Sequence, residues 1–179
     1  MFLKQSIVAL IVSANALFAG GLSLYSNDLT GQLTKTQEAS TFGCSGANIS
    51  PELHWDNAPA GTKSFAVTIY DPDAPTGSGW WHWVVFNIPA STKALPTDFG
   101  NVEKTQSIKA VQSVTDYGKP GFGGACPPKG DRAHRYIVTL YALDVESLPL
   151  DAKTMPANVG FMLNAHALQK ATMVSYYQR

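Results

Sequence analysis

The stretch DPDAPTGSGWWHWVVFNI, residues 71–88, decides the fold because it joins a turn to a long apolar run. The run HWVVFNIP (82–89) is largely apolar rather than alternating, which is typical of a central strand covered on both faces. The preceding DPDAPTGSG is rich in proline and glycine and predicts a sharp reversal of the chain. Asp71, Asp73 and His82 therefore lie beside a loop between two strands, where protein scaffolds commonly carry functional groups.

The segments around this stretch extend the β framework. Residues 65–71 (FAVTIYD) and 134–144 (HRYIVTLYALD) alternate apolar and polar side chains, which predicts half-buried strands. Clusters of turn-forming residues separate the strands, and the eleven prolines and fifteen glycines gather in them. The sequence therefore predicts a mainly β fold with long connections.

One helix is predicted near the C-terminal end. Pro156 can occupy a first helical turn, and residues 157–170 carry apolar side chains at helical spacing (Val159, Met162, Leu163, Ala167). Residues 171–178 (ATMVSYYQ) then predict a closing strand. His166 falls in the helix, and we leave it out of the site because a lone helical histidine is more often packed or solvated than functional.

The length of the chain predicts one globular domain, and its balanced charge argues against a nucleic-acid partner. The chain has 179 residues, the length of a single domain, with 13 basic and 13 acidic side chains. No arginine-rich segment or basic patch of the kind that binds phosphate backbones is present in the sequence. We therefore expect residues 20–179 to form one domain.

The first nineteen residues have the layout of a secretory signal peptide. Lys4 supplies a positive charge, an apolar run covers 7–12, and small residues follow, with cleavage expected after Ala16 or Ala19. The run is too short for a transmembrane anchor. The alternative is an uncleaved buried helix. The signal peptide predicts a periplasmic or secreted protein.

The two cysteines, Cys44 and Cys126, are 82 positions apart. An oxidising compartment favours a disulfide between them. The alternative is a pair of independent buried thiols, which an exported protein would seldom keep reduced.

A second cluster of polar side chains complements Asp71 and His82. The loop GFGGACPPKGD leads into a strand that begins at His134, and such loops can present backbone N–H groups to an anion. In an extended strand His134 and Tyr136 share one face, and Arg135 takes the other. We expect Asp71 to orient the imidazole of His82 and to favour its charged form, with tryptophans as walls (Trp80, Trp81, Trp83).

Each of these residues also has an ordinary structural interpretation. Asp-Pro-Asp is common turn chemistry, and either histidine alone would be unremarkable. Their joint appearance after two glycine-proline loops favours a site, and the predicted site is a small anion pocket with an apolar rim.

Three ordered motifs give the chain a family resemblance. DPDAP (71–75), WHWVV (81–85) and PPKG followed by HRY (127–136) resemble the phosphatidylethanolamine-binding proteins, also called Raf kinase inhibitor-like proteins, and in particular their exported bacterial branch. SPELHW (50–55) also matches, and the likeness covers nearly the whole mature chain. It implies a β-sandwich of two sheets with a few peripheral helices.

The resemblance also implies a cavity for phosphate, acetate or a phosphorylated head group. Carried over motif by motif, it assigns ligand-binding residues (Asp71, His82, His134, Tyr136 and, at the mouth, Trp80) and residues that support the loops (Asp73, Pro127, Pro128). Many relatives have glycine at the position of Cys126, so a disulfide there would change the shape of the site. The long C-terminal extension of animal members is absent, and kinase inhibition is not carried over.

The leading interpretation is an exported binding protein that needs no cofactor and catalyses nothing. An alternative is a hydrolase that uses a His–Asp pair, although the sequence has no G-x-S-x-G elbow or other evident nucleophile. A metal site is a third alternative, with acceptable ligand types but no recognised spacing (Asp71, Asp73, His82, His134). The protein could also act through its surface, as a protease inhibitor or on a host partner, and a homodimer is an expectation from resemblance alone.

Overall fold

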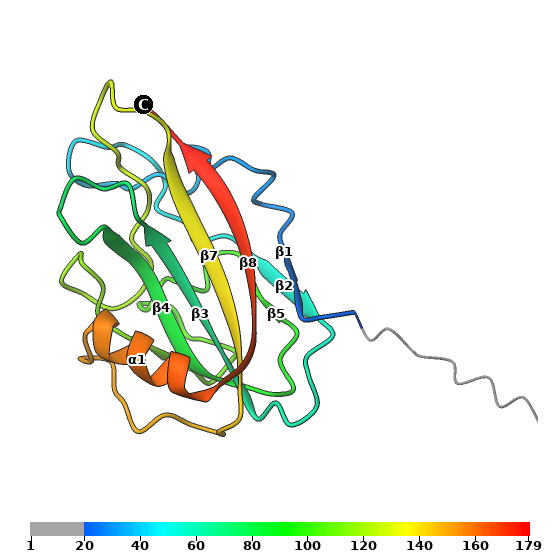
Figure 1. Cartoon of the computed structure of the whole chain (residues 1–179). Helices are drawn as coiled ribbons and strands as arrows, with labels where there is room; N and C mark the ends of the chain where they lie inside the picture. Colours follow the sequence, from blue (N-terminus) through cyan, green and yellow to red (C-terminus); the bar gives the residue numbers. More distant parts are fainter. Residues whose placement is uncertain (1–19) are drawn as a thin grey trace, which may run out of the picture.

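A five-stranded antiparallel sheet forms the centre of the molecule, in the order β6-β4-β3-β7-β8 (Figure 1). The coordinates are a computed structural model, and the structure describes residues 20–179. The predicted signal peptide, residues 1–19, lies outside these described residues. The strands of this sheet are β6 (Val111–Gln112), β4 (Trp80–Pro89), β3 (Ser64–Asp71), β7 (His134–Leu143) and β8 (Ala167–Tyr177).

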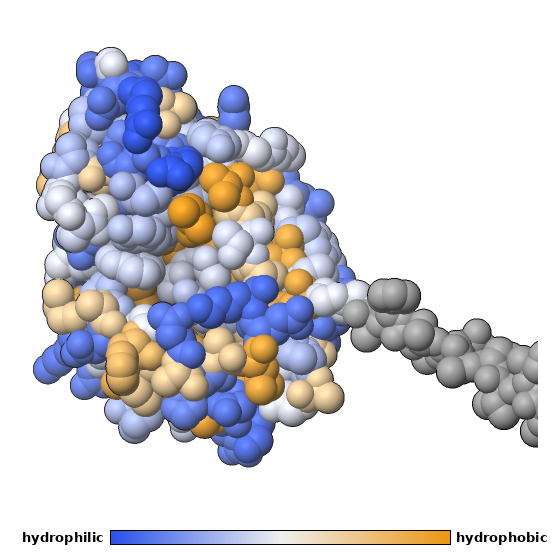
Figure 2. All heavy atoms as spheres, viewed as in Figure 1, coloured by the Kyte–Doolittle hydropathy of each residue, from blue (hydrophilic) through white to orange (hydrophobic). Residues whose placement is uncertain are grey.

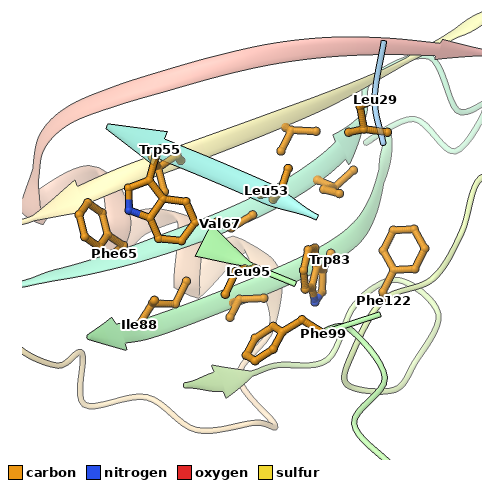
Figure 3. Close-up of a cluster of buried hydrophobic side chains, with 14 of the residues drawn as sticks. Leu29, Leu53, Trp55, Phe65, Val67, Trp83, Ile88, Leu95, Phe99 and Phe122 are labelled. Atoms are coloured by element: carbon orange, nitrogen blue, oxygen red, sulfur yellow. The ribbon is translucent and has the colours of Figure 1, made fainter. Parts of the chain in front are cut away.

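A second, three-stranded antiparallel sheet packs against one face of the first. It consists of β1 (Ser23–Tyr25), β2 (Leu53–Asp56) and β5 (Ala94–Leu95), in the order β1-β2-β5. These short strands give no periodic signal in the sequence. Apolar side chains from both sheets form the larger core between them (Figure 3), including Leu53, Trp55, Phe65, Trp83 and Leu95. The predicted mainly β fold with two sheets is therefore confirmed.

The helix α1 (Pro156–His166) covers the other face of the large sheet. Its buried residues Val159 and Leu163 pack on residues of β4 and β7, such as Phe86 and Leu143. α1 is the only α-helix within residues 20–179, fewer than the few peripheral helices expected. No helix in this range is both long and apolar enough to cross a membrane.

Two sequence predictions need correction. The strand at 65–71 is buried on both faces rather than one, because β3 is the central strand and lies between the core of the two sheets and the helix side. The predicted helix over 157–170 ends at His166, and β8 begins at the next residue. The ladder with β7 reaches back to Ala167 through pairs such as Ala142 with Gln169, so strand pairing overrides helical spacing there.

The exposed surface carries isolated apolar side chains. In the face shown in Figure 2, hydrophobic residues form small groups separated by hydrophilic ones. Such scattered apolar exposure is normal for a folded protein.

Candidate functional site

The predicted site residues come together at one end of the large sheet. Asp71 ends β3, Trp80 begins β4 and His134 begins β7, at the upper end of the sheet in Figure 1. The register pairs Asp71 with Trp80 directly. A cavity of about 190 Å³ opens here, lined by Phe42, Asp71, Ala74, Pro75, Thr76, Trp80, His82, Tyr117, Cys126, Pro127, Pro128, His134 and Tyr136. It is smaller than the roughly 300 Å³ at which pockets for drug-sized ligands begin.

The carboxylate of Asp71 is held by three donors. Its Oδ1 accepts hydrogen bonds from the N–H groups of Asp73 (2.8 Å) and Ala74 (3.1 Å), which fixes the turn after β3. Its Oδ2 lies 2.8 Å from Nδ1 of His134. The predicted pairing of Asp71 with His82 is therefore wrong: the carboxylate meets His134, and His82 is bonded to the backbone oxygen of Gly123.

Both ring nitrogens of His134 face carboxylates. Nδ1 meets Asp71, and Nε2 lies 3.3 Å from Oδ2 of Asp131. An imidazole donates from both nitrogens only when both carry a proton. His134 therefore has no free ring nitrogen with which to act as a general base in this arrangement.

His82 is buried and is fixed by the loop that follows β6. Its Nδ1 donates to the backbone oxygen of Gly123 at 2.7 Å. Burial lowers the pKa of His82, although the Gly123 oxygen and the negative charge of Asp71 act in the opposite direction. The imidazole is thus neutral near pH 7, contrary to the expectation of a charged ring, and its Nε2 is then an acceptor.

Two buried donors beside the cavity have no partner. The hydroxyl of Tyr136 and Nε1 of Trp80 are both inaccessible to solvent and make no hydrogen bond. Burial raises the pKa of Tyr136, so its hydroxyl keeps its proton. Leaving a buried donor unpaired costs about 1–3 kcal/mol.

In the loop 121–131, expected to present N–H groups to an anion, the N–H groups of residues 122–125 are already used. Each already donates within the protein, to Gly100 O, His82 O, the Asn48 side chain and Gln37 O respectively.

Tyr117 and Phe42 belong to the cavity wall and were not identified from the sequence. Tyr117 donates its hydroxyl to Gly124 O at 2.5 Å, and burial raises its pKa. Its ring packs so closely on Gly123 that a Cβ there would collide with it. Both aromatic residues lie in loops without periodicity, and an aromatic residue among glycines and prolines is the only signal that could have found Tyr117.

The expected disulfide joins the two loops at the rim. The Cα atoms of Cys44 and Cys126 are 5.9 Å apart, and Cys126 itself lines the cavity. The bond anchors the segment that carries Phe42 beside Pro127 and Pro128.

Asp73 and two of the tryptophans lie outside the cavity. Asp73 accepts hydrogen bonds from the guanidinium groups of Arg135 and Arg132, and its pKa is held far below the usual value, chiefly by Arg135. Trp83 is part of the core between the sheets. Trp81 stacks on Tyr70 at 4.6 Å between ring centroids. Of the three expected walls, only Trp80 lines the cavity.

The four residues considered as metal ligands do not converge, because Asp73 is bound to arginines and His82 to a backbone oxygen. Within residues 20–179 no group of three or more histidine, cysteine and acidic side chains is placed to hold a metal ion.

Residues 28–178 match the family model of phosphatidylethanolamine-binding protein. The chain is 51% identical to the UPF0098 protein YbcL of Escherichia coli K12 over 163 residues, which cover 89% of each protein. It is 49% identical to the UPF0098 protein YbhB of the same organism over 87% of this chain and 99% of that protein.

Solved structures agree with these sequence matches. The crystal structure of E. coli YbcL, described as a new member of the mammalian PEBP family, superposes with a TM-score of 0.86 and 50% identity, over 88% of this chain and 98% of that one. A homologue from Chlamydia trachomatis, CT736, gives a TM-score of 0.74 at 27% identity, over 89% of this chain and 98% of that one.

Proposed function

Because the chain belongs to the phosphatidylethanolamine-binding protein family, we propose that it is an exported binding protein whose pocket takes a small phosphate-bearing or other anionic head group without transforming it. The observation that carries the proposal is one small cavity at the end of the large sheet, lined by the side chains that the family resemblance assigns to a ligand (Asp71, Trp80, His82, His134, Tyr136). The layout of residues 1–19 supports export to the periplasm or beyond.

The charges around the pocket determine how an anion would bind. Among residues 20–179 no lysine or arginine lines the cavity, and Asp71 is the only carboxylate that does. His134 is committed to Asp71 and Asp131, while His82 is neutral because burial lowers its pKa. We expect a bound anion to bring a proton to His82, which turns Nε2 into a donor.

A proton taken up on binding makes the affinity depend on pH. The pKa of His82 is lowered in the free protein and would rise in the complex, so affinity increases as pH falls below 7. For one proton the change is at most about tenfold per pH unit. Calorimetric titration with sulfate, whose charge does not change between about pH 5 and 8, measures this slope. The variant His82→Gln should lose it, and an unaltered slope in that variant would contradict proton uptake at His82.

Thermal unfolding of residues 20–179 with phosphoethanolamine, phosphate and acetate tests the binding itself. A ligand that binds only the folded state stabilises it by about 2.7 kcal/mol at a hundredfold excess over its Kd. Tyr136→Phe should weaken this stabilisation. Tyr25→Phe is the matched control, because that hydroxyl bonds Asp56 on the surface and does not line the cavity.

The same preparation separates the alternatives. Turnover of phosphoesters that is lost in His82→Ala would replace binding by hydrolysis as the function. A folded protein that no anion stabilises would contradict the pocket proposal and favour action through protein contacts.

A further inference from the structure

The guanidinium of Arg179 joins the two loops of the pocket rim, which are the loop that ends at Cys44 and the loop that begins at Cys126. Arg179 follows β8, which ends at the same end of the sheet as the cavity (Figure 1). Its Nε donates to the backbone oxygen of Pro127 at 2.6 Å, and its Nη1 donates to that of Gly43 at 2.9 Å. Each acceptor is the direct neighbour of one of the two bonded cysteines. Arg179 therefore forms a second, noncovalent cross-link beside the disulfide.

The backbone that carries this guanidinium is itself anchored. β8 pairs with β7 as far as Tyr177, two residues before Arg179. The N–H of Gly130 donates to the backbone oxygen of Arg179 at 3.1 Å, and the side chain of Gln178 donates to the backbone oxygen of Asp131 at 2.9 Å. The large sheet therefore fixes the position from which the guanidinium reaches the two loops.

Both cross-linked loops supply walls of the cavity. Phe42, next to Gly43, lines it although 68% of its surface is accessible, and Cys126 and Pro127 line it from the other loop. The backbone of Phe42 is left-handed, with φ of 54°. A residue other than glycine keeps such a conformation only where its surroundings hold it there. The disulfide and the Arg179 hydrogen bonds both hold the loop that carries Phe42.

Two cross-links between the same loops stabilise each other. When one of them forms, it brings the loops together and lowers the entropic cost of forming the other. The coupling is reciprocal, because it is a difference in free energy between states of one molecule. The equilibrium between the disulfide and the two thiols therefore depends on the hydrogen bonds of Arg179.

We propose that Arg179 is a positioning residue of the pocket, which holds the walls at Phe42 and Pro127 in place and favours the disulfide between Cys44 and Cys126. Its guanidinium does not line the cavity and acts through the two backbone oxygens that it binds. The effect on a ligand rests on the proposed function, whereas the effect on the disulfide does not.

The equilibrium between disulfide and dithiol, measured in redox buffers of dithiothreitol, tests the cross-link without a ligand. Reduction transfers two electrons and two protons to Cys44 and Cys126, while dithiothreitol is oxidised to its cyclic disulfide. In Arg179→Gln we expect this equilibrium to move toward the dithiol by about three- to tenfold, which corresponds to about 15–30 mV. Arg179→Lys keeps the charge but loses the fork of donors, so it should recover only part of the shift. An unchanged potential in Arg179→Gln would overturn the proposal.

Lys170→Gln is the matched control. Lys170 also belongs to β8, but its ammonium donates to Asn164 of α1, away from the rim. Its removal should leave the potential of the disulfide at the parent value. A shift as large as that of Arg179→Gln would show that any lost cation on β8 has this effect, and would refute a specific cross-link.

Calorimetric titration with inorganic phosphate tests the consequence for the pocket. Arg179→Gln should weaken phosphate binding severalfold, and more so once the disulfide is reduced, because only molecules with the rim in place bind. A shifted potential with unchanged affinity for phosphate would overturn the positioning role and leave the proposed function intact. If phosphate does not bind the parent protein, the proposed function and the positioning role fail together, and the potential still supports or refutes the cross-link.

Discussion

Two tryptophans on β4 show how the same strand serves the core and the site. Trp83 is fully buried between the sheets, and its Nε1 donates to Gln112 Oε1 at 2.8 Å, while Gln112 in turn donates to Phe99 O. Trp80, three residues earlier, has a buried Nε1 with no partner. Within residues 20–179, the indole N–H of the core tryptophan has a hydrogen-bond partner and that of the pocket tryptophan has none.

An unpaired nitrogen alone does not mark a binding site. Trp55 Nε1 also lacks a partner, yet Trp55 is 1% exposed within the core cluster and lines none of the cavity described above. What separates Trp80 from Trp55 is that Trp80 lines the cavity, together with Tyr136, whose hydroxyl is also unpaired. An unpaired buried donor therefore indicates a binding site only where its residue also lines a cavity.

The largest expected effect is a difference in stability between alanine variants of the two tryptophans. Trp83→Ala removes a fully buried side chain and strands Gln112, so it should lower the free energy of unfolding by about 3–5 kcal/mol. Trp80→Ala removes a half-buried side chain and should cost clearly less while abolishing anion binding. Urea unfolding and calorimetry measure the two properties. Equal destabilisation by both substitutions would contradict the assignment of Trp83 to the core and Trp80 to the pocket.

Removal of the disulfide tests how far the stability of the pocket rim depends on this bond. The free energy of unfolding of the double variant Cys44→Ser, Cys126→Ser should fall by about 2–4 kcal/mol. The reason is that the bond closes a loop across 82 positions and restricts the unfolded chain. The loss should be concentrated in hydrogen-exchange protection around Phe42 rather than in β3. Uniform loss across the sheet would show that the rim and the core unfold as one unit.

Acid should destabilise the pocket rim before the core, through protonation of Glu38. Burial alone would raise the pKa of Glu38, but hydrogen bonds from Lys35, Tyr177 and the N–H of Ser45 outweigh it and lower the pKa to about 2. The stabilisation is present above about pH 4.5 and is lost as pH falls toward 2, up to about 3 kcal/mol in all. Urea unfolding at a series of pH values measures it. Glu38→Gln should flatten this part of the pH profile, and a parallel profile would refute the assignment.

The smallest expected effect concerns stability at Tyr136. Its hydroxyl is buried and unpaired, so Tyr136→Phe removes a polar group that stabilises nothing in the free protein. We expect the free energy of unfolding to stay within about 1 kcal/mol of the parent or to rise, while affinity for phosphate falls. A large loss of stability would mean that the hydroxyl has a partner within the folded chain.

The long strands were predictable because their side chains carry the pattern. In β7, Tyr136, Val138 and Leu140 all face the core as their alternation predicts. The loop DPDAP and the start of β7 were also correctly connected to one site. The pairing of Asp71 was not predictable, since strands carrying both histidines flank β3 and only the side-chain contacts reveal that His134 rather than His82 meets Asp71.

The loop residues were missed for a different physical reason. Phe42 adopts a left-handed backbone conformation, with φ of 54°, and Tyr117 lies in a turn, so neither belongs to a repeating element. Their positions depend on the disulfide and on Gly123, which are tertiary constraints. The protonation of His82 also depends on burial that composition does not reveal.

The central position of β3 sets the order in which the molecule can assemble. β3 reaches β4 through the short loop 72–79, but its other neighbour is β7, where Ser64 pairs with Leu143. Contacts between residues so distant in sequence form slowly, because the long intervening loop must be closed first. A nascent chain that ends before residue 134 can hold the β3–β4 hairpin but has no pocket. Ligand binding should therefore appear late in refolding, after β7 has paired with β3.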